Sequence, residues 1–482
     1  MYDFLIIGAG ISGAMIAREF SRYDVKTLVL DKENDVANHA TIANSAIVHS
    51  GHDPKHGSLK AMLSVRGNEL YDTLEKELHI PLLRTGGLLL AHGEEEEETL
   101  FEIEENARLN GVKTTRLSRE ALLEKEPHLA DDVTLGLDLP TTKVTYPWEV
   151  ALNGLENAIE NGVEFKKNEA VEQIEKTEDG FIVKTKSKNA YETRFVINAA
   201  GAFADRIAAM VEGTPDYTIT PRRGDYIVLD QNARGFVTHT IYPVPHPIKG
   251  KGVLLTPQTH GNLLLGPTSE LQDDPEDVAV RKEGLSQIKE DVKRLMKDVP
   301  FHYTIRTFAG VRATSTHKDF YIKPSRHHDR FIHVAGIDSP GLTAAPAIGE
   351  YVVNQLIKPR MELKKREDFN PYAKTYTLFQ DMSEEEKKQA FKNDPRHGRI
   401  ICRCEKITEG DLMKHIERTL SADTVKAVKK RVRIGSGRCQ GGYCQHQVIK
   451  KLAEVQNKDA TEVDYYRKDT PVLKSETKEV KE

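Results

Sequence analysis

The 482-residue chain has a formal net charge of −5 with 30% charged residues, so charge provides no global attraction to nucleic acid or to an anionic membrane. This length allows two or three domains of about 100–200 residues, each with a sizeable core. The apolar stretches are shorter than the ~20 residues of a membrane helix, and the first residues lack the basic segment of a secretory signal. We expect a cytoplasmic protein, with peripheral association with the inner face of the membrane left open.

The first thirty residues have the pattern of a strand, a helix and a second strand. Residues 2–20, YDFLIIGAGISGAMIAREF, start as a buried strand, break at glycines and continue with helical spacing, and the next strand ends at Asp31. Gly8 permits a tight turn, Gly10 lets backbone amides approach a pyrophosphate, and Gly13 packs helix against strand. Asp31 can accept hydrogen bonds from ribose hydroxyls; the alternative is a packing turn without a ligand. The predicted cofactor-binding residues here are Gly8, Gly10, Ile11, Ser12, Gly13 and Asp31.

A polar loop with three histidines follows at residues 44–60, NSAIVHSGHDPKHGSLK. It is either a surface loop or the reacting part of an active site. Its glycine- and proline-rich second half is typical of a solvated loop, so we expect His52 and His56 to be ordinary polar side chains there. The flanking Ser50 and Gly51 allow the chain to turn.

The rest of the first 360 residues alternates between strand and helix patterns. Residues 162–187 alternate like antiparallel strands, residues 221–267 have strand character, and residues 284–299 have the spacing of an amphipathic helix. Segments 196–205 and 334–349 each place small residues where a strand gives way to a helix. Such close backbone approaches, dispersed along the chain, suit one long cofactor such as FAD, whereas a nicotinamide-binding domain is usually contiguous.

Several motifs, in their order along the chain, resemble the D-amino-acid-oxidase-like superfamily of FAD-dependent oxidoreductases. They are the N-terminal fingerprint, NSAIVHSG, VINAAGAFAD, PRRGDYIVLD, KGVLLTP, NLLLGPT, FAGVRA and GIDSPGLTAAPAIG. Within this superfamily, the motifs resemble those of the branch that contains L-2-hydroxyglutarate dehydrogenases and anaerobic-type glycerol-3-phosphate dehydrogenase A subunits. The resemblance covers about residues 1–370 and implies an α/β fold, with a Rossmann-like FAD-binding domain interleaved with a β-rich substrate domain. Its FAD-binding parts are expected at about 1–80, 145–215 and 305–360, and its substrate-domain parts at about 81–144 and 216–304.

The resemblance also implies an active site. It places NSAIVHSG beside the flavin ring, where the neutral imidazole of His49 suits removal of a hydroxyl proton at cytoplasmic pH; the alternative is that His49 only packs near the cofactor. Arg312 and Lys251 are expected to hold the substrate anion, the alternative for each being a surface ion pair. The further cofactor-binding residues implied are Asn44, Ser45, Val171, Ala200, Gly201, Gly336, Gly341, Leu342 and Thr343.

The implied reaction is oxidation of a small anionic alcohol, with sn-glycerol 3-phosphate to dihydroxyacetone phosphate as the leading expectation. The chain lacks the HGG-type stretch of aerobic glycerol-3-phosphate dehydrogenases, so this substrate rests on the anaerobic-type resemblance alone. L-2-hydroxyglutarate, or an amine or amino acid, is the alternative substrate. A non-catalytic flavin and iron–sulfur electron-transfer subunit is the alternative of another class. Nucleic acid binding has no supporting signature.

The four cysteines, Cys402, Cys404, Cys439 and Cys444, form a C-x-C and a C-x4-C pair near the C-terminus. In a cytosolic chain such clustering favours metal ligation over disulfides, and four thiolates can hold a 2Fe-2S cluster or a zinc ion. GRIICRCEKITEGDL and RIGSGRCQGGYC resemble the bacterioferritin-associated-ferredoxin-like 2Fe-2S domain. This implies a small, mainly helical domain at 399–456 that passes electrons to an acceptor protein or a quinone chain; a zinc-stapled docking module, or no metal, remains open. Residues 371–398 are expected to be a linker and residues 457–482 a polar tail.

A basic patch surrounds the second cysteine pair. It can offset an anionic cluster or attract an acidic electron-transfer partner, and a solvated helix face is the common alternative. Its members are Lys426, Lys429, Lys430, Arg431, Arg433 and Arg438.

Overall fold

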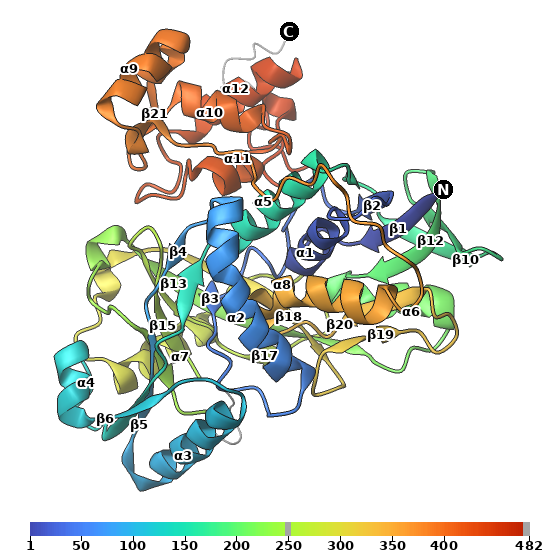
Figure 1. Ribbon diagram of the computed structural model, residues 1–482. Coiled ribbons are helices and arrows are strands. Elements are labelled where there is room, and N and C mark those ends of the chain that lie inside the picture. Colours follow the sequence, from blue (N-terminus) through green and yellow to red (C-terminus); the bar gives the residue numbers. More distant parts are fainter. Residues whose placement is uncertain (246–251, 476–482) are drawn as a thin grey trace. The chain divides into compact units, whose positions relative to one another are not determined.

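The computed structural model describes residues 1–245 and 252–475, which form two compact units, each with a hydrophobic core of its own (Figure 1). The first unit consists of residues 1–32 and 36–373, and the second of residues 33–35 and the chain from 374 on. Among the described residues, none of the helices combines the length and the apolar composition needed to cross a bilayer.

An eight-stranded sheet forms the centre of the first unit. Its parallel strands are β1 (Tyr2–Ile7), β2 (Thr27–Leu30), β9 (Glu164–Lys166), β12 (Ala190–Asn198) and β20 (Phe331–Ala335). Its antiparallel strands are β10 (Val171–Lys176), β11 (Phe181–Thr185) and β19 (Tyr321–Pro324). Strand β1 lies between β2 and β12. The chain therefore adds β2 on one side of β1 and later adds β12 on the other side. This is the switch point at which open α/β sheets bind ligands, outside the carboxyl ends of the strands.

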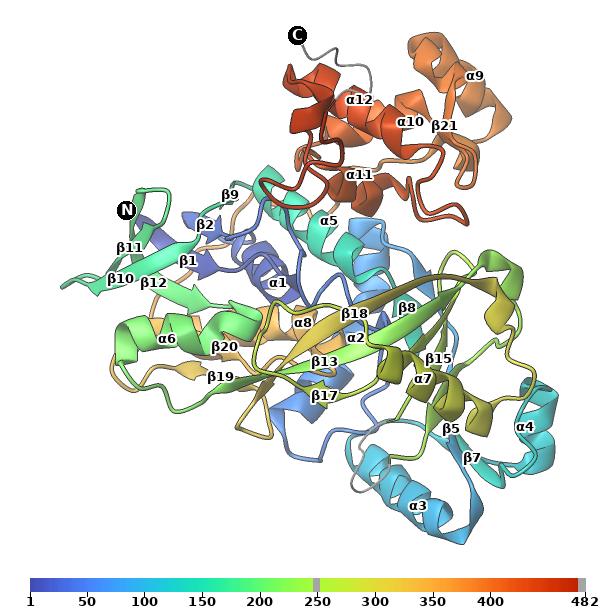
Figure 2. The same cartoon turned by 180° about the vertical axis from the view of Figure 1, so that it is seen from behind.

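Helices cover both faces of this sheet (Figures 1 and 2). The alternating residues of β1 explain why: Phe4 stacks on Phe20 of α1 (Ile11–Phe20) at a centroid distance of 4.1 Å, whereas Leu5 and Ile7 share a core with α6 (Ala204–Glu212). On the α1 side, α1 packs against α5 (Pro147–Glu160) and α8 (Gly341–Tyr351), and α8 packs against α2 (Leu59–Leu78). A π-helical turn, Val352–Ile357, extends α8.

A nine-stranded sheet forms the β-rich part of the first unit. Its strands are β5 (Gly87–Ala91), β6 (Thr115–Ser118), β7 (Leu135–Asp138), β13 (Ile219–Leu229), β14 (Thr240–Pro243), β15 (Leu254–Pro257), β16 (Leu263–Gly266), β17 (Glu270–Leu271) and β18 (Thr304–Ser315). The helices of this part are α3 (Gly93–Leu109), α4 (Arg119–Lys125) and α7 (Lys282–Leu295). A small third sheet joins β3 (Ile47–Val48), β4 (Leu82–Leu83) and β8 (Lys143–Thr145). The strands of the two large sheets interleave along the chain, which confirms the predicted fold class.

The second unit is mainly helical, as predicted. A short hairpin, β21 (Ile400–Cys402) and β22 (Ile407–Thr408), precedes α10 (Glu409–Ile416), α11 (Val425–Val432) and α12 (Gln445–Gln456). The segment expected to be a linker contains a further helix, α9 (Glu384–Asn393), which begins at a capping box of Ser383 and Glu386. Val463, in the expected polar tail, is fully buried in the core of this unit.

The basic patch on α11 is not the solvated helix face that the sequence also allowed. Lys430 and Arg431 are buried, and their side chains contact the carboxylate of Asp35 at 2.6 and 2.8 Å within the second unit. Arg433 pairs with buried Glu405 at 2.9 Å. Burial raises the pKa of Asp35, but attraction to Arg431 and Lys430 outweighs it and holds that pKa well below its usual range. Three of the six cations of the patch therefore form buried ion pairs that stabilise the fold.

Replacing Asp35 with Asn leaves two buried cations without their carboxylate, and we expect a loss of about 3–5 kcal/mol in the stability of the second unit. Because the folded-state pKa is depressed, this contribution is complete above the ordinary pKa of about 3.9 and disappears as the pH falls below it. Urea unfolding at several pH values, followed by circular dichroism, measures both effects. The control is Glu384→Gln, at a side chain that is 85% exposed; equal stability of the two variants would contradict the expectation.

Candidate functional site

The glycine turn between β1 and α1 has no room for side chains at two of its positions. A Cβ on Gly8, where φ is +108°, would lie 2.5 Å from the carbonyl oxygen of Ala199, and a Cβ on Gly13 would lie 1.9 Å from that of Gly8. Gly10 differs: a Cβ there would meet only Thr41 Oγ1, at 3.4 Å, and Gly10 begins α1 without a side-chain cap. The helix N-terminus is therefore approachable through Gly10, as binding of a pyrophosphate requires.

Asp31 has a contact within the protein that the sequence analysis did not predict. Its Oδ2 accepts a hydrogen bond from the Ala9 amide at 2.6 Å, so the carboxylate fixes the glycine turn itself. Its carbonyl oxygen accepts from the Glu169 amide at 2.8 Å, which brings Val171, the first residue of β10, to the same region. Thr41, which the sequence analysis missed, accepts a hydrogen bond from the Ile11 amide at 3.0 Å.

Two more predicted segments lie at the same edge of the sheet. Ala200 and Gly201 follow β12, and Gly336 follows β20, so all three come after the carboxyl ends of parallel strands. Gly201 and Gly336 have φ values of +56° and +66°, which glycine adopts without steric cost. Four segments, distant in sequence, thus converge where a dinucleotide binds in such folds.

His49 is held by its main chain between two helices. Its amide donates to Thr343 Oγ1 of α8 at 2.9 Å, and its carbonyl oxygen accepts from Asn68 Nδ2 of α2 at 2.9 Å. Its ring lies beside the buried ring of Tyr242, with a centroid distance of 6.0 Å. The structure therefore brings together His49 and Thr343, both predicted, and adds Asn68 and Tyr242, which have no local sequence signal.

The loop before His49 is shaped by Asn44 and reaches the β-rich sheet. The Asn44 side chain donates to the carbonyl oxygen of Thr41 at 2.9 Å and accepts from the Ala46 amide at 2.8 Å. Next to it, Ser45 Oγ lies 3.4 Å from the hydroxyl of Tyr226 on β13. This contact places the long β13–β18 ribbon next to the loop that carries His49.

Close packing of α2 on α8 fixes the other predicted residues. Tyr71 of α2 donates its hydroxyl to the carbonyl oxygen of Leu342 at 2.8 Å. Gly341, which begins α8, donates its amide to the carbonyl oxygen of Asp338 at 2.5 Å. A Cβ on Gly67 of α2 would lie only 2.0 Å from the carbonyl oxygen of Thr343. Gly67 thus sets the position of the hydroxyl that holds His49.

Gly67→Ala should destabilise the first unit by about 1–3 kcal/mol through overpacking. This is opposite to the gain of up to about 1 kcal/mol that Gly→Ala normally gives in a helix. Thermal unfolding followed by flavin fluorescence measures the change. Thr73→Ala, at an exposed position of the same helix, is the control. A Gly67→Ala protein more stable than the wild type would contradict the packing argument.

The other two histidines of the polar loop have different environments. His52 is buried, with 4% exposure, and its Nδ1 lies 2.8 Å from Ser50 Oγ, so the expectation of a solvated side chain is wrong for it. The reason is that Tyr242 and His52 pack edge to face, at 5.6 Å, beneath the loop. His56 is exposed as expected, and its ring pairs with Asn110 at 3.1 Å.

Arg312 on β18 has a half-buried guanidinium that donates a hydrogen bond to the carbonyl oxygen of Thr268, at 2.7 Å. Within the described part of the chain it has no carboxylate partner, and burial lowers its pKa, although a guanidinium stays protonated. By contrast, the neighbouring Arg223 is buried against Glu270, to which it is ion-paired. Lys251, the other predicted anion-binding residue, lies outside the described residues.

The four cysteines form two close pairs. Cys404 Sγ and Cys439 Sγ are 3.8 Å apart, and Cys402 and Cys444 hydrogen-bond to each other. The hydrogen bond from Cys444, against the effect of burial, lowers the pKa of the Cys402 thiol to about 6, so this thiol is ready to ligate as a thiolate. All four thiols are free.

This pairing fits a two-iron cluster better than a zinc ion. At about 2.3 Å from a tetrahedral zinc, four sulfurs would all lie within about 4 Å of one another. Among the described residues, no three cysteine sulfurs lie within 4.8 Å of one another. Two separate pairs are what a [2Fe-2S] cluster needs, because each iron takes two thiolates.

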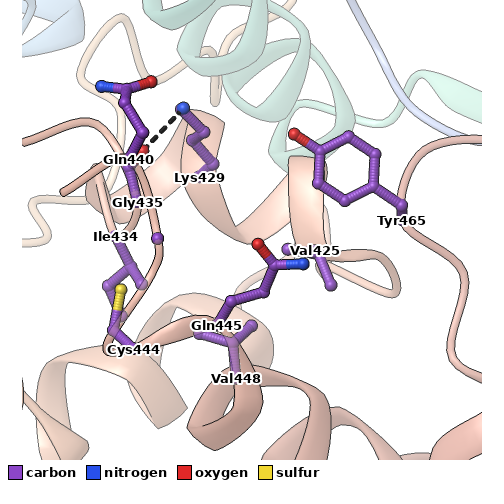
Figure 3. A pocket seen from close by; sticks show the side chains of 10 residues that line it. Val425, Lys429, Ile434, Gly435, Gln440, Cys444, Gln445, Val448 and Tyr465 are labelled. Atoms are coloured by element: carbon purple, nitrogen blue, oxygen red, sulfur yellow. Dashed lines mark hydrogen bonds between the residues drawn. The ribbon is translucent and has the colours of Figure 1, made fainter. Parts of the chain in front are cut away.

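A small cavity lies beside the buried pair (Figure 3). Its volume is about 20 Å³, room for little more than one water molecule. Cys444, Gln445 and Val448 line it from the start of α12, and Lys429 closes part of it with a hydrogen bond of 2.7 Å to the Gly435 carbonyl oxygen. It is too small to hold a substrate.

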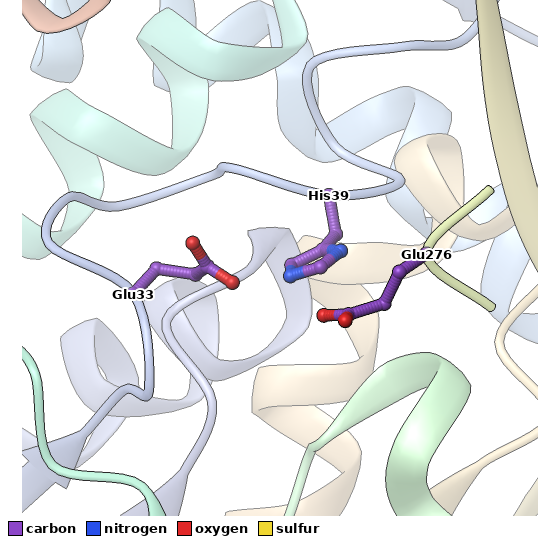
Figure 4. Close-up of side chains that lie close together, drawn as sticks. All are labelled: Glu33, His39 and Glu276. Carbon is purple, nitrogen blue, oxygen red and sulfur yellow. The ribbon is translucent and has the colours of Figure 1, made fainter. Parts of the chain in front are cut away.

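Figure 4 shows His39 and Glu276 of the first unit pointing toward one another, with ligand atoms within 4.8 Å. Glu276 is already ion-paired with Lys32, at 2.5 Å, and the third residue drawn, Glu33, belongs to the second unit. Two candidate ligands, one neutralised by a lysine, are fewer than metal sites use. We assign no metal to them.

Comparison with protein families places this geometry in a class. Residues 3–355 match the family model of FAD-dependent oxidoreductases, and residues 400–454 match the BFD-like [2Fe-2S] binding domain. The chain belongs to the FAD-dependent oxidoreductase family. The glycine turn, the converging strand ends and the paired thiols fit the corresponding cofactors, FAD and a [2Fe-2S] cluster, as the sequence predicted.

Individual proteins of this family are similar to the chain to different degrees. A glycerol 3-phosphate dehydrogenase of Caloramator mitchellensis is 43% identical over 480 residues, which cover 99% of both chains. An L-2-hydroxyglutarate dehydrogenase of Escherichia coli is 28% identical over 400 residues, covering 74% of this chain and 93% of the relative. Among solved structures, the dithionite-reduced L-alpha-glycerophosphate oxidase of Mycoplasma pneumoniae with FAD bound has a TM-score of 0.73 at 29% identity, covering 77% of this chain and 98% of that one.

Proposed function

We propose that the protein is an FAD-dependent dehydrogenase that oxidises sn-glycerol 3-phosphate to dihydroxyacetone phosphate. The observation that carries the proposal is Arg312, a half-buried guanidinium without a carboxylate partner in the described chain. It lies on the same ribbon as Tyr226, whose hydroxyl meets Ser45 of the loop that carries His49. An anion-binding group and a proton acceptor therefore face one region, as oxidation of an anionic alcohol requires.

His49 acts as the base in this proposal. FAD, when bound, supplies the hydride acceptor. Thr343 and Asn68 anchor the main chain of His49 on both sides, so the backbone that carries the imidazole is fixed against both helices. A neutral imidazole takes the hydroxyl proton as the carbon–hydrogen bond breaks. Arg312 donates to the phosphate, and Lys251 is a second proposed cation.

The remaining predicted residues are proposed to bind FAD. The glycine turn and the α1 N-terminus receive the pyrophosphate, the segments after β12 and β20 lie along the cofactor, and the start of α8 borders the flavin. The proposed residues are Gly8, Gly10, Ile11, Ser12, Gly13, Asp31, Asn44, Ser45, Val171, Ala200, Gly201, Gly336, Gly341, Leu342 and Thr343. Cys402, Cys404, Cys439 and Cys444 are the proposed cluster ligands. Asp31 acts on the turn as well as on the ribose.

The alternative substrate, L-2-hydroxyglutarate, is also an anionic alcohol that Arg312 could bind. Glycerol 3-phosphate is favoured because the glycerol 3-phosphate dehydrogenase is 43% identical over 99% of this chain. The L-2-hydroxyglutarate dehydrogenase is 28% identical over 74% of it. Anaerobic stopped-flow bleaching of the flavin, with glycerol 3-phosphate, L-2-hydroxyglutarate and amino acids in turn, separates the candidates. Bleaching by the hydroxy acid but not by the phosphate would reject the proposed substrate.

His49→Asn should lower the rate of flavin bleaching by glycerol 3-phosphate by about 10²- to 10⁴-fold, the usual contribution of a general base. The visible flavin spectrum should be unchanged, because the main-chain contacts of residue 49 remain. His56→Asn, at the exposed histidine of the same loop, is the matched control and should bleach normally. Unimpaired bleaching in His49→Asn would instead favour an electron-relay subunit without chemistry of its own.

Arg312→Met should lower kcat/KM for glycerol 3-phosphate by about 10- to 100-fold, through the loss of hydrogen bonds to a charged group worth about 1.5–3 kcal/mol. The effect should appear mainly in KM, and Arg312→Lys should recover only part of it, because lysine lacks the planar fork of donors. Steady-state kinetics with an artificial acceptor measure it. Arg326→Met, at a side chain that is 68% exposed, is the control. An equal loss of kcat/KM in the two variants would show that Arg312 does not bind the substrate anion.

A further inference from the structure

The two cysteine pairs differ in their access to solvent. Cys402 and Cys444 are each 1% exposed, within the core of the second unit. Cys404 is exposed and Cys439 is half-buried. A Cβ on Gly437 would lie 2.4 Å from Cys404 Cβ, so the two loops that carry this outer pair touch closely. The inner pair would therefore hold a cluster from the side of the core, and the outer pair, Cys404 and Cys439, would hold it from the side of the surface.

Cations flank the outer pair. Arg403 precedes Cys404, Lys406 follows it by two residues, and Arg438 precedes Cys439; all three cations are exposed. The structure gives them no ion-pair partner among the described residues. The acid in the same loop, Glu405, is buried and neutralised by Arg433 at 2.9 Å. This surface, called the outer face below, therefore carries uncompensated positive charge.

An aromatic side chain completes the outer face. Tyr443 is 81% exposed, more than any other large apolar residue in the described part of the second unit. Its amide hydrogen-bonds to the Cys439 sulfur, so its backbone is fixed next to the outer pair. Tyr and Arg are the residue types that most often dominate the energetics of protein interfaces.

We propose that the outer face, made of Arg403, Lys406, Arg438 and Tyr443 around Cys404 and Cys439, docks an acidic protein that carries one electron. The inference rests on the proposed function only for the source of the electrons. Oxidation of one secondary alcohol releases two electrons and two protons, so two carrier molecules are each reduced by one electron per turnover. The positive face would attract the carrier and place it next to the outer pair of cysteines, which would hold the cluster.

A membrane surface is the less favoured partner. Basic segments that bind anionic lipid typically gather four to eight Lys or Arg residues, whereas the outer face has three cations. These three surround a redox-active pair of thiols, a position that serves electron transfer and adds nothing to lipid binding. The compact patch with one aromatic residue resembles a small protein-docking site.

The test uses the cluster- and FAD-loaded protein, reduced with dithionite and freed of excess reductant. It is mixed in a stopped-flow instrument with ferric cytochrome b5, an acidic haem protein, or with ferric cytochrome c, a basic one. The test variant combines Arg403→Glu, Lys406→Glu and Arg438→Glu. The matched control, with the same change in net charge, combines Lys392→Glu, Lys450→Glu and Lys458→Glu, all at exposed positions of the second unit.

The wild type should reduce cytochrome b5 faster than cytochrome c, at a second-order rate that falls as salt is added. The test variant should reduce cytochrome b5 about tenfold more slowly than the wild type or slower still, which lies within the range of electrostatic steering. The control variant should react at nearly the wild-type rate. Calorimetric titration of the oxidised protein with ferric cytochrome b5 should show the same loss of binding. Tyr443→Ala should weaken this binding without changing its salt dependence.

Three results would overturn the inference. Equal rates for the test and control variants would show that position on the surface is irrelevant. A slower rate with unchanged cytochrome b5 binding and a shifted cluster potential, measured by redox titration with electron paramagnetic resonance, would show that the cations only tune the cluster. Sedimentation of the wild type, but not of the test variant, with phosphatidylserine vesicles would assign the face to lipid. Because dithionite is the reductant, failure of glycerol 3-phosphate to bleach the flavin would reject the proposed function and leave this test intact.

Discussion

The first unit depends on one constraint, the absence of side chains where β1, α1 and the end of β12 meet. The carbonyl oxygens of Gly8 and Ala199 occupy the positions that Cβ atoms of Gly13 and Gly8 would need. With the helix so close to the sheet, its N-terminus lies at the same edge as the ends of β2, β12 and β20. Because the strands are parallel, this single contact determines which distant segments can reach a common ligand.

The sequence was most informative where a function depends on local geometry. The glycine turn, the strand-to-helix transitions at Ala200 and Gly336, and the cysteine spacings were all recognisable, because each reflects a steric or ligand requirement within a few residues. Of the residues that surround His49, Thr343 was predicted, but Asn68 and Tyr242 were not recognisable. Asn68 lies on the next helix and Tyr242 on a strand nearly two hundred residues later, and nothing in the sequence around either residue marks it.

Charge was the least predictable property. A run of Lys and Arg on α11 has the pattern of a solvated face, yet Lys430 and Arg431 are buried against Asp35, which lies about four hundred residues earlier. Similarly, the Asp31 carboxylate accepts a hydrogen bond from the Ala9 amide and so fixes the glycine turn. Whether a charged side chain is paired depends on contacts between distant parts of the chain, which composition and spacing do not encode. Arg312 was identified only through a family resemblance.

The way His49 is anchored has a consequence for how such enzymes diversify. Its amide and carbonyl oxygen are bound by α8 and α2, the helices of the cofactor-binding half, whereas Arg312 stands on the β13–β18 ribbon. The proposed proton acceptor and the proposed anion-binding residue therefore lie on separate parts of the fold. If these roles hold, substitutions on the ribbon would change which anionic alcohol binds and leave the proton-accepting side of the site in place.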